Sequence, residues 1–433
     1  MTTSSTKSLS CAGLIKTVRY QFLKVTDPRE FKNGSTISLT DILMSGFAMF
    51  SLKFPSLLQF DRKRSDIAIQ TNLRNLYGVK QIPSDTYLRE RLDELNSTSL
   101  RPAFKKVFAA AQRGKVLESF QFINGHYLLS LDGTGQLSSG KVACKHCCKK
   151  VHKNGQVTYY HQMLGACIVH PDRSNVIPLC PEAIKSQDGN AKNDCERNAS
   201  KRLIENFRKE HPHLKVIVVE DGLASNGPHI ELLQQHRLKF ILGAKPGDHK
   251  HLFSLLENSD EAVYHELKDD KGSLHQFRFL NDVPLNKSHP ELLVNVLEYR
   301  ETTSKGTEIN FSWVTNIRVT SKNAYELMRG GRARWKIENE TYNTLKNLGY
   351  NFEHNYGHGK QYLATVFCLL MMLAFLIDQI QEIACGFFQM AKGYAGTYRG
   401  LWERMRLFFE YFELTSWELF YRMIAKSKPP NST

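Results

Sequence analysis

A chain of 433 residues is long enough for two to four domains around at least one large core. Hydrophobic residues make up 41% of it, which is typical of globular proteins and excludes a disordered or low-complexity chain. Lysine and arginine outnumber aspartate and glutamate by 58 to 43, and the formal charge of +15 favours a polyanionic partner such as nucleic acid over a basic protein without one.

The first residues, MTTSSTKSLSCAGLIK, contain no apolar segment of the kind that marks a secretory signal peptide. We therefore expect a cytoplasmic protein whose nine cysteines are free thiols or metal ligands. The longest apolar run, TVFCLLMMLAFLI at 365–377, is short for a membrane span and predicts a buried helix and no membrane partner.

In chain order, helical periodicity dominates residues 1–125, which we interpret as a helical N-terminal region. Short apolar runs then predict strands, and amphipathic segments predict helices. The strands are expected at 127–135, 157–171, 175–184, 214–222 and 239–247, and the helices at 194–211 and 226–237. Three strands followed by alternating helix and strand predict an α/β fold with a mixed sheet over 126–247.

Residues 248–320 contain four more strand-like runs separated by turn signals, which predict a β-rich insertion. Helical periodicity returns at 321–350, in a segment that contains RWKIENETYNTLK at 334–346. Residues 351–433 predict a C-terminal helical region.

Two of the expected strands end in an acidic residue followed by glycine, at Asp132 and Asp221. Asp-Gly is a common turn pair, so each could mark only a turn. A carboxylate at the end of a buried strand is also costly unless it binds a cation or hydrogen-bond donors. Because both acids end apolar strands of one sheet, we favour a shared site.

The third acidic position is in the helix at 321–350. At 100° per residue, Glu338 lies on the face of Trp335 and Arg334 and is expected to pack inward, whereas Glu340 lies with Lys336 and predicts a solvated ion pair. An ordinary salt bridge with Arg334 is the alternative for Glu338. Three carboxylates meeting at one sheet edge could hold two Mg²⁺ or Mn²⁺ ions, which activate a water or a 3′-hydroxyl towards a phosphodiester.

The order of LDGT, a strand ending in ED, a β-rich insertion and RWKIE resembles the DDE transposases of bacterial insertion sequences. Within them it is similar to the group whose RNase H-like catalytic domain carries a β insertion before the last catalytic helix. The resemblance covers roughly 125–350. It implies that Asp132, Asp221 and Glu338 bind the two cations and that Arg334 supports the glutamate.

The family pattern also has a tyrosine three residues before this arginine and a lysine seven residues after the glutamate. Here these positions are Gly331 and Leu345, and Lys346 comes one residue later. We keep Lys346 as the candidate for the lysine role.

The segment Cys144-Lys145-His146-Cys147 has the spacing of half a structural zinc site, which His152 and His161 could complete. No second Cys-x2-Cys pair is present. We interpret the segment as a basic hairpin with free thiols and keep structural zinc at Cys144 and Cys147 as the alternative.

These observations lead to the expectation of a bacterial, nucleoid-associated DNA transposase that cleaves element ends and transfers them to target DNA, as a homodimer in the synaptic complex. The N-terminal region would recognise the terminal inverted repeats. An inactive or repurposed DNA-binding relative is the alternative that Gly331 and Leu345 support. An RNase H-like nuclease that acts on RNA or hybrids is a third possibility.

Overall fold

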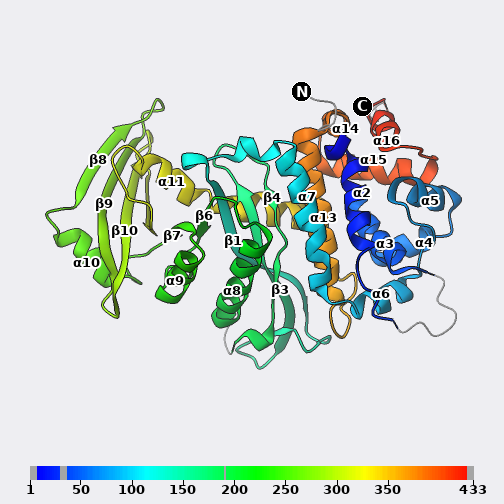
Figure 1. Ribbon diagram of the computed structural model, residues 1–433, viewed down its shortest axis with the longest axis horizontal. Coiled ribbons are helices and arrows are strands. Elements are labelled where there is room, and N and C mark those ends of the chain that lie inside the picture. The colour runs from blue at the N-terminus through cyan, green and yellow to red at the C-terminus, as the bar shows by residue number, and fades with distance from the viewer. Residues whose placement is uncertain (1–6, 30–36, 190–191, 427–433) are drawn as a thin grey trace.

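The computed structural model describes residues 7–29, 37–189 and 192–426, apart from the side chains of 192–194. Figure 1 shows an elongated molecule in which a central sheet lies between a β-rich end and a helical end. The expected α/β architecture, with a large mixed sheet, a β-rich insertion and helical regions before and after it, is confirmed.

The central part of the sheet is built on β1 (Tyr127–Ser139), which lies between an antiparallel and a parallel neighbour. On one side it pairs with β3 (Val157–Val169), whose other edge pairs with β2 (Cys148–Val151), β4 (Ile177–Pro178) and β5 (Glu182–Ile184). On the other side it pairs in parallel with β6 (Val216–Glu220), which pairs in parallel with β7 (Lys239–Gly243). Thus the two acid-bearing strands, β1 and β6, are direct neighbours.

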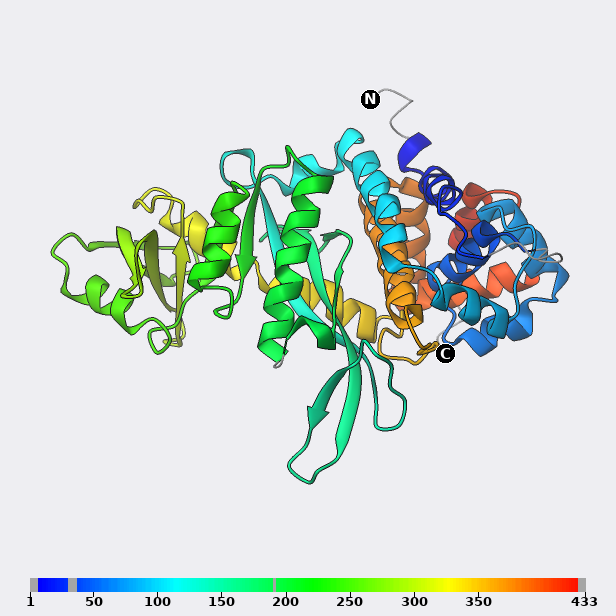
Figure 2. The same cartoon turned by 60° about the horizontal axis from the view of Figure 1, so that its bottom comes forward.

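Helices cover both faces of this sheet, as Figures 1 and 2 show from two directions. The connections to β6 and β7 contain α8 (Lys192–Glu210) and α9 (Gly227–Gln235), which lie in front of the strands in Figure 1. The segment after the insertion contains α11 (Ala324–Arg332), a π-helical turn η6 (Ile337–Tyr342) and α12 (Asn343–Asn347), and it lies behind the strands. The sequence predicted one helix here, but it is interrupted at residues 333–334 and widened at 337–342.

The β-rich insertion extends the central sheet. Its strands are β8 (Val263–Lys268), β9 (Leu274–Asn286), β10 (His289–Thr302) and β11 (Glu308–Thr315), and β11 pairs antiparallel with β7. The prediction of a β-rich region at 248–320 did not include α10 (Lys250–Asn258), which buries Leu252, Phe253 and Leu256. The spacing of these three apolar residues fits one face of a helix. In so short a segment, however, sequence periodicity does not distinguish a helix from a strand.

The N-terminal and C-terminal helices pack together at the other end of the molecule (Figure 1). The N-terminal helices are α2 (Cys11–Phe22), α3 (Leu39–Ser51), α4 (Leu57–Lys63), α5 (Ile67–Asn72) with the π-turn η1 (Leu73–Tyr77), α6 (Asp85–Asp93) and α7 (Arg101–Arg113). The C-terminal helices are α13 (Leu363–Ala384), α14 (Gly386–Ala395), α15 (Tyr398–Tyr411) and α16 (Trp417–Lys426). We call these two sets together the helical body.

The central helix of the helical body is α13. Among the described residues it is the one helix long and apolar enough to cross a membrane, and its apolar window is 94% buried inside the protein. The buried helix expected at 365–377 is therefore present. Direct bonds join the two sets of helices: Asn72 donates to the carbonyl oxygen of Phe409 at 2.8 Å and accepts from the amide of Leu414 at 2.7 Å.

Candidate active site

Asp132 lies inside β1, where it pairs with Gly165 of β3. The turn expected at Asp132-Gly133 is absent, because β1 continues to Ser139. The parallel pairing of β1 with β6 stops at Ser130, so Asp132 lies just beyond the point where the two strands separate. A small cavity lined by Asp132 and Asp221 lies at this separation.

Asp221 follows the last residue of β6, and its Oδ1 accepts a hydrogen bond from the amide of Leu223 at 2.9 Å. Asp221 can therefore cap this turn through Oδ1 and still offer Oδ2 as a ligand to a cation. The preceding Glu220 points to a separate partner: its carboxylate lies 2.6 Å from Nε2 of His229 in α9. Successive residues of a strand point to opposite faces, which is consistent with these different partners of Glu220 and Asp221.

Glu338 lies in the π-turn η6, and two contacts attach this segment to β1. Ser130 donates to the carbonyl oxygen of Arg334 at 3.0 Å, and the hydroxyl of Tyr342 donates to the carbonyl oxygen of Asp132. A side chain at Gly165 would collide with that hydroxyl, so glycine is required for the close approach. Single-turn π-helices are frequent at functional sites because they redirect side chains.

The pKa of Asp132 is affected by its burial and by three neighbouring charges. Burial raises the pKa of Asp132 to about 6, the charge of Arg334 opposes this rise, and the charges of Asp221 and Glu338 add to it. The nearest guanidinium nitrogen of Arg334 is 3.8 Å from Asp132 Oδ2. A partly buried carboxylate repelled by two others is a group whose ionised form a cation would stabilise.

The predicted surroundings of Glu338 are partly wrong. Trp335 was expected to face inward with Glu338, but it is 47% exposed, and the guanidinium of Arg334 lies 4.4 Å from the centre of its ring. The break before the π-turn rotates Trp335 away, so a regular 100° step does not hold here. The expected ion pair of Glu340 with Lys336 is present at 3.4 Å. The ion pair recorded for Arg334 is with Asp132 rather than Glu338.

The glycine at position 331 has a structural cause. The space that a side chain would need there is filled by the indole of Trp313 from β11, whose Nε1 would lie 2.4 Å from a Cβ atom on Gly331. Trp313 is 4% exposed and stacks on Phe311. An aromatic side chain from the insertion therefore packs where the family pattern has a tyrosine.

The late position of Lys346 also has a structural cause. A π-turn contains one residue more than an α-helical turn. Because η6 comes between Glu338 and α12, residue 346 rather than residue 345 comes two turns after Glu338. Consistent with this register, Leu345 is fully buried, whereas Lys346 is half-buried, with its Nζ 2.9 Å from Glu353.

One acidic residue near the site was not singled out from the sequence. Glu196 of α8 lines the same small cavity as Asp132 and Asp221. Its carboxylate would lie 3.1 Å from a Cβ atom on Gly133, so the glycine after Asp132 makes room for it. No local pattern indicates this proximity, because Glu196 lies in a helix rich in charged residues.

A groove of about 1610 Å³ begins at Asp221 and continues along the insertion. Its lining includes the turn after β6, the segment from Gly331 to Trp335 except Ala333, and residues of β8–β11. Its charged lining consists of Arg197, Lys245, Arg278, Arg300, Arg332 and Arg334, against Glu220, Asp221, Asp248 and Glu298. Aromatic rings of Tyr264, Phe311 and Trp335 also line it.

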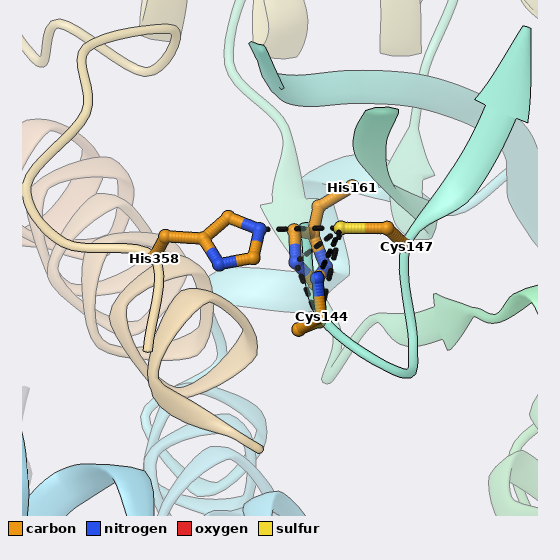
Figure 3. A group of neighbouring side chains, drawn as sticks. All are labelled: Cys144, Cys147, His161 and His358. Carbon is orange, nitrogen blue, oxygen red and sulfur yellow. Dashed lines mark hydrogen bonds between the residues drawn. The ribbon is translucent and has the colours of Figure 1, made fainter. Parts of the chain in front are cut away.

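The cysteines named from the sequence lie away from these acids. Cys144 and Cys147 lie in the loop between β1 and β2, and their sulfur atoms face His161 of β3 and His358 (Figure 3). His152, which was considered as a ligand, instead contacts Thr158 at 2.8 Å. His358 was missed as a member of this group because it lies 211 positions from Cys147 in the chain.

No protein-family model matches the chain, and no curated protein matches it. Among solved structures, the chain is similar to a cryo-EM structure of the piggyBac transposase synaptic complex with hairpin DNA, with a TM-score of 0.46 and 13% sequence identity. The match covers 100% of this chain and 88% of that chain.

Proposed function

We propose that this protein is a metal-dependent DNA transposase of the DDE type, with Asp132, Asp221 and Glu338 as the ligands of two Mg²⁺ or Mn²⁺ ions. The proposal is supported by the shared cavity of Asp132 and Asp221, and by the electrostatic influence of Arg334, Asp221 and Glu338 on Asp132. Oxygen ligands of this kind suit hard divalent cations.

The sheet supports the same proposal. Its central strands follow the order β5, β3, β1, β6, β7, in which successive strands are antiparallel as far as β1, and β6 and β7 are parallel to β1. An RNase H-like catalytic domain, which the family resemblance implies, has a mixed sheet of this kind. The insertion after β7 comes before the segment with Glu338, as the same resemblance leads one to expect.

When bound, two divalent ions would supply an activated water or 3′-hydroxyl and stabilise the leaving oxygen. The chain itself would orient the substrate. Arg334 neutralises part of the charge around Asp132 and presents a planar donor to a phosphate. The cationic groove would hold the DNA next to Asp221, and its aromatic rings offer surfaces on which unpaired bases stack.

The recognition of the terminal inverted repeats, first assigned to residues 1–125, belongs in this proposal to the helical body, because the C-terminal helices complete its core. Two DNA ends must be brought together, so we propose a homodimer in the synaptic complex.

The proposal is tested by incubating the purified protein with DNA that carries the inverted repeats flanking its gene, in Mg²⁺ or Mn²⁺. We expect nicking at the repeat ends. Glu338→Gln should reduce it by more than the roughly 10–100-fold that loss of a group next to a metal ligand costs.

The matched control is Glu340→Gln, two residues away, where the carboxylate pairs with Lys336. This variant should keep its activity. Equal cleavage by wild type and Glu338→Gln would contradict the site. Salt-dependent DNA binding without any cleavage would favour a repurposed DNA-binding protein, and preference for RNA–DNA hybrids would favour a nuclease.

A further inference from the structure

A second group of metal-ligating side chains lies apart from the acidic site. Cys144, Cys147, His161 and His358 each direct a sulfur or ring nitrogen towards a common point, with all four atoms within 4.8 Å of one another (Figure 3). Cys147, His161 and His358 are buried, at 2%, 6% and 8% exposure. Both cysteines are free thiols.

The distances within this group are those of a tetrahedral zinc site. Zinc–sulfur bonds of about 2.3 Å and zinc–nitrogen bonds of about 2.05 Å place two sulfurs about 3.8 Å apart, and a sulfur and a nitrogen about 3.6 Å apart. The two sulfur atoms are 3.7 Å apart. His161 Nε2 lies 3.5 Å from each sulfur, and His358 Nε2 lies 3.2 Å from Cys147 Sγ.

The surrounding hydrogen bonds orient the same atoms. His358 Nδ1 lies 2.8 Å from the carbonyl oxygen of Gly359, so this nitrogen carries the proton and Nε2 is left with its lone pair towards the cysteines. The amide of His146 points to Cys144 Sγ, and the amide of Cys144 points to Cys147 Sγ, each at 3.4 Å. Amide donors of this kind stabilise thiolates.

We propose that Cys144, Cys147, His161 and His358 bind one structural Zn²⁺ ion. Two thiolates and two imidazoles suit zinc and not the hard cations expected at the acids. Four protein ligands close the coordination sphere, which is the mark of a structural and not a catalytic site. The sequence favoured a basic hairpin with free thiols; we propose instead its alternative, the zinc site, with His358 in place of His152.

The position of the site gives the ion a mechanical role. It connects the β1–β2 loop and β3 to the segment that joins α12 to α13. That segment follows the helix with Glu338 directly in the chain, and β3 pairs with the strand that contains Asp132. Zinc would thus hold the segment between α12 and α13 against the β1–β2 loop and β3 of the sheet.

Metal analysis of the tag-free, full-length protein tests the proposal without any DNA substrate. We expect one zinc per chain, and loss of that zinc in both Cys147→Ser and His358→Asn. The matched controls are Cys148→Ser, whose sulfur lies towards the carbonyl oxygen of Ile184, and His152→Asn; both should keep the metal. Removal of zinc by a chelator should increase proteolysis of the 348–362 segment.

If a variant fails to fold, cobalt substitution in the wild-type protein still tests whether the four residues bind a metal ion. Replacement of the zinc by Co²⁺ should give the absorption of a tetrahedral, thiolate-bound cobalt ion. A reduced wild-type protein that contains no zinc and gives no such spectrum with added Co²⁺ would overturn the proposal. Equal zinc loss in Cys148→Ser and Cys147→Ser would do the same. Because neither readout uses cleavage, the zinc site and the transposase proposal can fail independently.

Discussion

The ionised carboxylate of Asp132 lowers the stability of the folded protein. Its pKa is raised to about 6, mainly by burial. An aspartate in an unfolded chain titrates near about 3.9. Between these values the folded protein binds the proton more tightly than the unfolded chain, so the free energy of unfolding falls as the pH rises through this window. Above about pH 6 the full penalty of the buried charge is present.

Asp132→Asn is therefore expected to raise the free energy of unfolding at pH 7–8 by about 1–3 kcal/mol in the absence of divalent cations. The gain should shrink as the pH is lowered towards about 4, where the wild-type carboxyl is also neutral. Urea unfolding of the wild type and of Asp132→Asn in EDTA, at several pH values, measures this difference in the free energy of unfolding.

Added Mg²⁺ supplies the control for this prediction. It should raise the melting temperature of the wild type and leave that of Asp132→Asn nearly unchanged, because a ligand stabilises only the state that binds it. An Asp132→Asn variant that is less stable than the wild type at pH 8 in EDTA would contradict the raised pKa.

At the scale of single residues, the sequence singled out Asp132 and Asp221 because they follow apolar strand runs, and Glu338 and Arg334 because of their helical spacing and the resemblance of RWKIE; their roles stay predictions. It could not place Glu196 or His358. Their proximity to the sites depends on contacts across the sheet and across 211 positions of chain, which local periodicity does not encode. The inward position of Trp335 was wrong because the helix is not regular there.

The π-turn η6 is the element on which the geometry of Glu338 depends. Deletion of the exposed Asn339 should convert η6 to an ordinary α-helical turn, with Ile337 and Tyr342 still buried on the sheet. We expect an unchanged or raised melting temperature together with loss of metal-dependent DNA cleavage, since the proposed site depends on the widened turn that contains Glu338.

Circular dichroism melting and the cleavage assay together measure this outcome. Insertion of an alanine after Asn343, within α12, is the comparison, because it would rotate Leu345 out of the core and should destabilise the protein. A deletion variant that keeps full cleavage activity would show that the widened turn has no role in aiming Glu338.

At the scale of elements, the sheet strands were predictable because buried strands are continuous apolar runs bounded by turn residues. The π-turn was not, because it depends on a tertiary bond from Tyr342 to the main chain of Asp132. The same holds for β1, which continues past Asp-Gly because β3 offers partners as far as Tyr159. Turn propensity is overridden where a neighbouring strand continues the ladder.

At the scale of the whole molecule, a buried ion pair joins the N-terminal set of helices to the C-terminal set. Lys53, just after α3, donates to Asp378 of α13, which also accepts from Tyr350 at 2.6 Å. The ammonium group lies 3.9 Å from the ring centre of Trp402 in α15. Burial lowers the pKa of Lys53 and raises that of Asp378, and each charge opposes the shift of the other.

Lys53→Met should destabilise the protein by about 3–5 kcal/mol, because it leaves a buried carboxylate without its partner. The double variant Lys53→Met with Asp378→Asn should be more stable than Lys53→Met alone. Urea unfolding of the single and double variants measures the coupling.

The exposed pair of Arg422 and Glu418 is the control, and Arg422→Met should cost less than about 1 kcal/mol. If the double variant were as unstable as the single one, packing around Lys53 rather than its charge would explain the loss.

The sequence indicated helical regions at both ends of the chain but not that they form one body. Amphipathic periodicity shows that a helix has a buried face but does not indicate what covers that face. The bonds from Asn72 to α15 and from Lys53 to α13 connect positions more than 300 residues apart, and no local pattern predicts them.

This closure of the chain on itself has a consequence for synthesis. The N-terminal helices leave the ribosome first, but their apolar faces stay open until α13–α16 have been made. The helical body can thus close only after the insertion and α13–α16 have been synthesised. A chain interrupted within the insertion would lack α13–α16, so its N-terminal helices would keep their apolar faces uncovered and the product would be exposed to proteases rather than persist as a folded helical fragment.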